Sequence, residues 1–339
     1  MTKKESLYSL INISNIGKQI MAVSFTGGTT VTPGITINYP PPPNQNAVFA
    51  FGSNSYKNIV SSLGILEATS TVTPGASFRN QPGGSTYGSG RAIFAYGDTS
   101  PAVISTYNYV TSAGVIGADN SGVGTARQYA SGVGYGTTGQ GMFAYGLTPA
   151  GSQNMTNFVS NTGVIASDTP NVGTTASWSR GACTFGSTGQ AIFGFGGTPA
   201  YTSITNIVSN TGVIASDTVG VPGVTARRGL QAASYGGDKG IFGFGQTTTT
   251  PAATNTNITN LISNLGIVAA NIVNASATAR GPVGAATYGN DKAIFGFGFG
   301  PTGPSQINTT NLVSNTGVVA ANVTPVSGTQ SSVGCVSFN

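Results

Sequence analysis

An apolar hexapeptide that recurs six times constrains the fold of this chain more than any other feature. The copies read AVFAFG at 47–52, AIFAYG at 92–97 and GMFAYG at 141–146, and three more surround Phe193, Phe242 and Phe295. Their central phenylalanines lie 45 to 53 residues apart. This period is typical of four-stranded β-propeller blades, which take about 40 to 50 residues each, and not of helical repeats.

Two further markers recur with the hexapeptide. Ser-Asn-Thr-Gly stands at 160–163, 209–212 and 314–317, each time between β-prone apolar runs, and its glycine suits a hairpin turn with a bulge. A strand of small residues that ends in an aromatic residue and glycine stands at 180–186, 228–236 and 280–289. We assign the small-residue segment as the innermost strand A, where blades crowd together, the hexapeptide as strand B and the hairpin arms as strands C and D.

Strand B predicts how the blades pack. Alternation along a strand places Phe193 and Phe195 on one face of the sheet and Ile192 and Gly194 on the other. We therefore expect each blade to offer its rings to the glycine-lined face of a neighbour.

The blade count depends on the first 45 residues. The separation from Asn15 to Tyr39 equals that from Asn161 to Phe185, so the N-terminal region resembles another C-D-A set. The chain is predicted to be an all-β propeller of seven four-stranded blades, in which residues 10–45 and 329–338 form the closing blade. Residues 1–9 are then a tail and residues 10–339 a single domain. The alternative is six blades with residues 1–45 as an N-terminal attachment arm.

Composition excludes several classes of function. Charged residues make up 6% of the chain, and 13 basic against 8 acidic residues are scattered along it, without the clustered basic stripe of a nucleic-acid-binding protein. No run of 18 apolar residues predicts a membrane span, and the N-terminus has no apolar signal-peptide core. Cys183 and Cys335 lie at nearly matching repeat positions, which favours two buried free thiols and synthesis in a reducing cytoplasm.

The residue content also argues against catalysis. The chain has no histidine, and its two cysteines are not spaced as metal ligands. Asp119, Asp168 and Asp217 occupy one repeat position that later copies fill with asparagine, and Arg127, Arg227 and Arg280 follow this position by about eight to ten residues. A repeat-linked ion pair or turn cap explains this pattern. We expect no catalytic residue, no metal and no cofactor.

Strand order divides the loops between two faces. The short, uniform A–B and C–D turns share one face, whereas the irregular B–C loops and the D–A connections share the other. Variable loops on a rigid scaffold are the usual place for recognition. The candidate contacts for a partner or a glycan are Tyr56, Tyr107, Tyr201, Thr248 and Asn255.

The repeat unit from Thr205 to Gly245 has a distinctive sequence. It reads TNIVSNTGVIASDT, then TAR, then YGGDKGIFGFG. This resembles the Kelch-like propeller repeats of virion proteins of tailed bacteriophages, over about residues 10 to 338. The chain departs from cellular Kelch repeats in having a single tryptophan, which argues against a cytoskeletal or ubiquitin-ligase adaptor role.

The resemblance implies a structural protein of a phage virion, associated with the capsid or the tail, which stabilises the particle or contacts the host surface. Its expected partners are other virion proteins, with a host-surface glycan as a further candidate, and its expected location is the virion after assembly in the host cytoplasm. The resemblance carries no catalytic residues. A lectin-like glycan-binding module is the alternative, and a glycan-active enzyme is a third hypothesis.

Overall fold

The computed structural model describes residues 45–171, 173–219, 221–247, 254–301, 305–324 and 328–338. The strands predicted within residues 10–44 and the tail at 1–9 lie outside these residues. No helix that could span a membrane is found in the described part of the chain.

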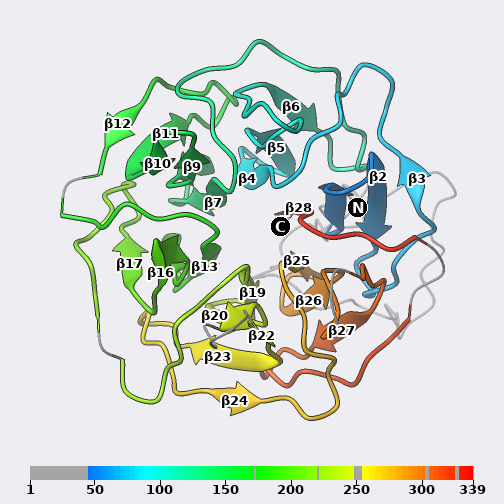
Figure 1. Cartoon of the computed structure of the whole chain (residues 1–339), viewed down its shortest axis with the longest axis vertical. Coiled ribbons are helices and arrows are strands. Elements are labelled where there is room, and N and C mark those ends of the chain that lie inside the picture. Colours follow the sequence, from blue (N-terminus) through cyan, green and yellow to red (C-terminus); the bar gives the residue numbers. More distant parts are fainter. Residues whose placement is uncertain are drawn as a thin grey trace, which may run out of the picture. The chain divides into compact units, whose positions relative to one another are not determined.

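Six antiparallel sheets, the blades, surround a central axis (Figure 1). Their inner strands, in order from blade 1 to blade 6, are β28 (Gly334–Ser337), β4 (Gly83–Tyr87), β7 (Ser131–Tyr135), β13 (Gly181–Phe185), β19 (Gln231–Tyr235) and β25 (Gly284–Tyr288). The second strands are β1 (Ala47–Phe51), β5 (Arg91–Ala95), β8 (Gln140–Ala144), β14 (Gln190–Gly194), β20 (Lys239–Gly243) and β26 (Lys292–Gly296). The third strands are β2 (Tyr56–Val60), β6 (Tyr107–Val110), β11 (Met155–Val159), β17 (Thr205–Val208), β23 (Ile258–Ile262) and β27 (Thr310–Val313). The predicted strands A, B and C are therefore confirmed.

The fourth strand is reduced to two residues or to a single bridge. Blades 1, 3 and 5 have β3 (Ser70–Thr71), β12 (Thr169–Pro170) and β24 (Ile272–Val273), and blades 2, 4 and 6 have isolated bridges such as Thr205 with Thr218. Side-chain hydrogen bonds hold the outer segment where a strand ladder would otherwise run. In blade 2, for example, the buried Asn108 amide donates to the Gly117 carbonyl at 2.9 Å.

The all-β propeller is confirmed, but over the described residues the ring has six blades and not seven. The C-terminal strand β28 pairs with β1, with Val336 opposite Val48, so the last strand A completes the first hexapeptide's blade. The inner strands then contact one another in a closed cycle from β28 through β4, β7, β13, β19 and β25 back to β28 (Figure 1). Because β28 pairs with β1, β1 has no unpaired edge where the two ends of the ring meet, and the cycle has no position for a seventh inner strand.

An aromatic pair packs the contact between each two neighbouring blades, which we call a seam. A phenylalanine in strand B of one blade meets the aromatic residue that ends strand B of the preceding blade, edge to face, with ring centroids 5.0 to 5.5 Å apart. The pairs are Phe49 with Phe297, Phe94 with Phe51, Phe143 with Tyr96, Phe193 with Tyr145, Phe242 with Phe195 and Phe295 with Phe244. Each of these rings is 0% exposed, and burial of one such side chain contributes about 2 to 3 kcal/mol.

The prediction that Phe193 and Phe195 share one face is wrong. Phe193 packs on Tyr145 of the preceding blade, whereas Phe195 packs on Phe242 of the following blade. The reason is the backbone of Phe195, whose φ of 66° takes it out of the pleated strand. The predicted glycine-lined surface is present at Gly194, where an added Cβ would lie 2.5 Å from the Phe242 ring.

Candidate functional site

The two ends of the ring differ as predicted. On one end, the turn face, the A–B turns lie beside the Ser-Asn-Thr-Gly turns. Asn315, in a Ser-Asn-Thr-Gly turn, donates a hydrogen bond at 3.3 Å to Asp291, in an A–B turn. On the other end, the loop face, D–A connections pair with B–C loops, as Trp178 does with Gly197. Three B–C loops form small sheets there, made of β9 (Leu147–Thr148) with β10 (Gly151–Ser152), β15 (Gly197–Thr198) with β16 (Ala200–Tyr201), and β18 (Arg227–Arg228) with β21 (Gln246–Thr247) and β22 (Thr254–Asn255).

The sequence-predicted contacts do not form one group. Tyr56 and Tyr107 begin the third strands β2 and β6 and do not lie in loops, and the Tyr107 ring packs on Tyr109 at 5.3 Å. Asn255 in β22 donates to the carbonyls of Phe299 and Gly300, so it ties its loop to the next blade.

Of the remaining two candidates, Thr248 lies outside the described residues, and Tyr201 in β16 belongs to a cluster that the sequence did not reveal. Tyr129 and Trp178 stack with centroids 4.8 Å apart. The Arg228 guanidinium carbon lies 4.7 Å from the Trp178 ring and 4.7 Å from the Tyr201 ring. We call Tyr129, Trp178, Arg228 and Tyr201 the loop-face cluster.

The backbone explains why these four side chains meet. Trp178 and Arg228 stand at equivalent D–A positions of neighbouring blades, where each pairs with its own B–C loop. Gly197 is needed beneath the indole, because a Cβ there would lie 2.8 Å from it. The matching positions in other blades hold Asn80, Gln128 and Gly281, so the cluster breaks the repeat.

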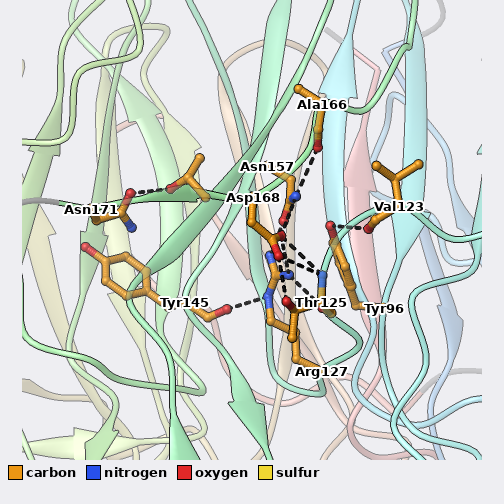
Figure 2. A network of polar contacts seen from close by, with 10 residues as sticks. Tyr96, Val123, Thr125, Arg127, Tyr145, Asn157, Ala166, Asp168 and Asn171 are labelled. Atoms are coloured by element: carbon orange, nitrogen blue, oxygen red, sulfur yellow. Dashed lines mark hydrogen bonds and ion pairs between the residues drawn. The ribbon is translucent and has the colours of Figure 1, made fainter.

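The repeated aspartates belong to the seams. In blade 3 the Asp168 carboxylate accepts hydrogen bonds from the Thr125 backbone amide at 3.0 Å, the Thr125 hydroxyl at 2.6 Å and the Asn157 amide at 2.8 Å (Figure 2). Arg127 lies 4.0 Å away. The predicted turn cap is therefore present, and its arginine partner precedes the aspartate in the chain instead of following it.

Arg127 itself is fully buried in the seam between blades 2 and 3. It donates to the Tyr145 carbonyl at 2.7 Å and to the Asn157 side-chain oxygen at 2.7 Å (Figure 2). Its guanidinium lies 3.9 Å from the centroid of the Tyr96 ring. The same stacking occurs for Arg79, Arg180, Arg227 and Arg280, each on the aromatic residue that ends strand B of the preceding blade.

Burial and hydrogen bonding act in opposite directions on these charges. Burial lowers the pKa of the Arg127 guanidinium, and the nearby Tyr96 and Asp168 offset this only in part. Burial raises the pKa of the Asp168 carboxyl, but the hydrogen bonds from Thr125 and Asn157 outweigh it and hold the pKa below its ordinary value. Asp168 therefore acts as an ionised cap of the chain segment that crosses from blade 2 to blade 3.

A cavity of about 260 Å³ occupies the centre of the ring and is lined by the inner strands. Hydroxyl side chains contribute from five of the six strands, namely Thr86, Thr184, Ser234, Thr287 and Ser337. The last four bond to one another or to neighbouring backbones, as Thr184 does with Ser234 at 2.8 Å. Among the described lining residues Arg91 is the one charged side chain, and the rest of the cavity wall is uncharged and rich in hydroxyl groups.

The two cysteines are free thiols, as predicted, but only Cys183 is buried and Cys335 is partly exposed. Burial raises the pKa of the Cys183 thiol to about 12 and also raises that of Cys335. Both are therefore held protonated and unreactive at neutral pH.

Comparison with known proteins gives a likeness of overall fold. No protein-family model matches the chain, and no curated protein matches it. Among solved structures, YjhT, a Kelch-type β-propeller protein of E. coli, superposes with a TM-score of 0.60 at 12% identity, over 81% of this chain and 95% of YjhT. At this identity the likeness concerns the fold alone. The chain has a Kelch-like β-propeller fold.

Proposed function

We propose that this propeller is a structural component of a tailed-phage virion that contacts its partner through the loop face. The virion assignment rests on the resemblance of its repeat to those of phage particles. The contact assignment rests on the loop-face cluster, where aromatic and charged side chains depart together from the repeat.

The division between the two faces supports this proposal. Six seams, each closed by an aromatic pair, make a rigid ring, and three irregular hairpins stand on one end of it. Recognition residues are disproportionately found on loops that a rigid scaffold positions. The turn face repeats one short turn around the ring, which suits attachment to a regular particle.

Association with particles tests the virion assignment. Phage particles purified through a density gradient should contain the protein at a fixed copy number relative to the major capsid protein, as measured by quantitative mass spectrometry. Its complete removal by a high-salt wash that leaves the major capsid protein in place would contradict a structural role.

A loop exchange tests the contact assignment. Replacement of residues 198–201 by Gly-Ser residues removes Tyr201 from the loop face and should slow host adsorption or lower particle stability. The matched control is the same replacement of residues 160–163 on the turn face. Equal effects of the two replacements, or no effect of the first, would place the contact elsewhere.

A lectin-like module is the second candidate function. The partly exposed aromatic and hydrogen-bonding side chains of the loop-face cluster favour it, because sugars are bound by such combinations. A free-standing lectin should bind defined glycans on an array as a purified protein, and should be absent from gradient-purified particles.

A further inference from the structure

Arg228 differs from the other arginines of the chain. Five of the seven arginines, Arg79, Arg127, Arg180, Arg227 and Arg280, are 0 to 1% exposed and donate hydrogen bonds within the seams. Arg91 is exposed and begins β5, the second strand of blade 2. Arg228 is partly exposed, and its guanidinium has no hydrogen-bond or ion-pair partner among the described residues.

Two aromatic rings hold this guanidinium in place. Its central carbon lies over the Trp178 ring and over the Tyr201 ring, at 4.7 Å from each centroid, and Tyr129 packs against the same indole. Its backbone is held in β18 by pairing with Gln246 of β21. A guanidinium stacked on rings loses little further freedom when it binds, so its N–H groups form a pre-oriented set of donors.

The Trp178 ring itself is already in contact with two protein side chains, which leaves less of its surface for stacking on a sugar. The unused chemistry of the cluster is hydrogen-bond donation. Besides Arg228, the indole N–H of Trp178 and the hydroxyl of Tyr201 have no hydrogen-bond partner within the described part of the chain, where ring contacts are their side-chain interactions.

The donors select the class of ligand. The planar fork of arginine matches two oxygens of a carboxylate or of a phosphate, and such charge-assisted pairs are about twice as strong as neutral ones. A single cation in one sector of the loop face does not form the basic stripe that nucleic acids need. The equivalent positions Asn80, Gln128 and Gly281 are neutral, so the anion would bind at one place on the ring.

We propose that Arg228, held over Trp178 and Tyr201, binds the acidic group of an anionic saccharide, either the carboxylate of a uronic acid or the phosphate of a phosphorylated sugar. The saccharide part of this proposal rests on the proposed function, in which the loop face contacts a partner, and takes a host-surface glycan as that partner. The acidic group accepts hydrogen bonds from the N–H groups of the Arg228 guanidinium. The Tyr201 hydroxyl and the Trp178 indole N–H supply neighbouring donors.

Binding by the full-length protein tests the proposal. Isothermal titration with oligogalacturonate, with a phosphorylated mannan fragment and with neutral dextran separates the carboxylate from the phosphate source. The Arg228→Gln variant should bind the preferred acidic saccharide about tenfold more weakly, since one charge-assisted hydrogen-bond pair is lost. Arg228→Lys should recover only part of the affinity, because lysine keeps the charge but not the planar fork.

The matched control is Arg91→Gln, which removes the same charge from another part of the ring. It should leave the affinity unchanged, and both glutamine variants should melt within about 2 °C of the parent protein. Equal loss in the two variants would show an effect of net charge only and would overturn the proposal. So would unchanged binding by Arg228→Gln, equal binding of dextran, or no binding of either acidic saccharide at millimolar concentration. Because these titrations use purified protein, they stand apart from the particle analysis that tests the virion assignment.

Discussion

Substitution of one seam arginine tests the physical account of the ring most directly. Arg127 donates to the Tyr145 carbonyl, to the Thr125 carbonyl at 3.0 Å and to Asn157, and it stacks on Tyr96. Arg127→Ala leaves these acceptors without a donor in a buried place and opens a cavity. Removal of one partner from a buried charged network costs about 3 to 5 kcal/mol.

Arg127→Gln should cost much less, because one seam of the ring already has glutamine at this position. At the closing seam Gln330 is buried and donates to the Asn58 side-chain oxygen, as Arg127 does to Asn157 in its own blade. A glutamine at position 127 can restore the bond to Asn157 but not the bond to Tyr145. We therefore expect a loss of about 1 to 2 kcal/mol.

Differential scanning calorimetry at pH 7 measures both losses. With an unfolding entropy of about 2.1 cal/mol/K per residue, a ring of this size has roughly 0.6 kcal/mol/K, so 1 kcal/mol shifts Tm by about 1.6 °C. Arg127→Ala should then melt about 5 to 8 °C below the parent protein, and Arg127→Gln about 2 to 3 °C below it. Equal shifts for the two variants, or a shift under about 1 °C for alanine, would refute the reasoning.

Three further expectations follow from the same structure. Phe193→Ala should destabilise the protein by about 3 to 5 kcal/mol in urea unfolding, whereas Tyr201→Ala, which is partly exposed, should cost under about 1 kcal/mol; equal costs would contradict the seam assignment. Because the pKa of Asp168 is lowered, its carboxylate stabilises the fold above about pH 4, and this contribution is lost as the pH falls further. Asp168→Asn should therefore narrow the difference in Tm between pH 6 and pH 3. An unchanged difference would argue against the cap. Deletion of residues 1–40 should leave the main melting transition in place, since β28 and β1 close the ring; loss of that transition would favour a structural role for the N-terminal segment.

The repeat in the sequence was sufficient to predict the propeller, strands A, B and C of each blade and the division of the faces, because strand periodicity and turn chemistry are local. The number of blades, in contrast, depends on a contact between the two ends of the chain. The spacing from Asn15 to Tyr39 imitates the repeat, but the pairing of Val336 with Val48 decides the closure, and no spacing reports a contact between such distant segments.

The loop-face cluster could be predicted only in part. Trp178 and Arg228 meet because equivalent positions of neighbouring repeats become neighbours in a ring. To predict this contact from the sequence, the D–A connections of the repeats must be aligned. Blade 4 makes this alignment difficult, because its D–A connection departs from the repeat. There Ser177 takes the usual arginine position and Arg180 folds back over Tyr145 to replace it.

The closing seam has a consequence for how the protein is made. Five seams join blades that follow one another in the chain, so each can form as soon as the next blade has left the ribosome. The sixth joins blade 6 to blade 1, through Phe297 and Phe49. Blade 1 is complete only when Gln330 and Ser331 bond to Asn58 and Ser53, which lie 272 and 278 positions away in the chain. Until β28 is synthesised, β1 has a bare edge and the two flanks of the open ring have no neighbour, which leaves the nascent chain exposed to aggregation. Aggregation in the cell should therefore depend on how quickly the last strand is completed and much less on the order in which the middle blades fold.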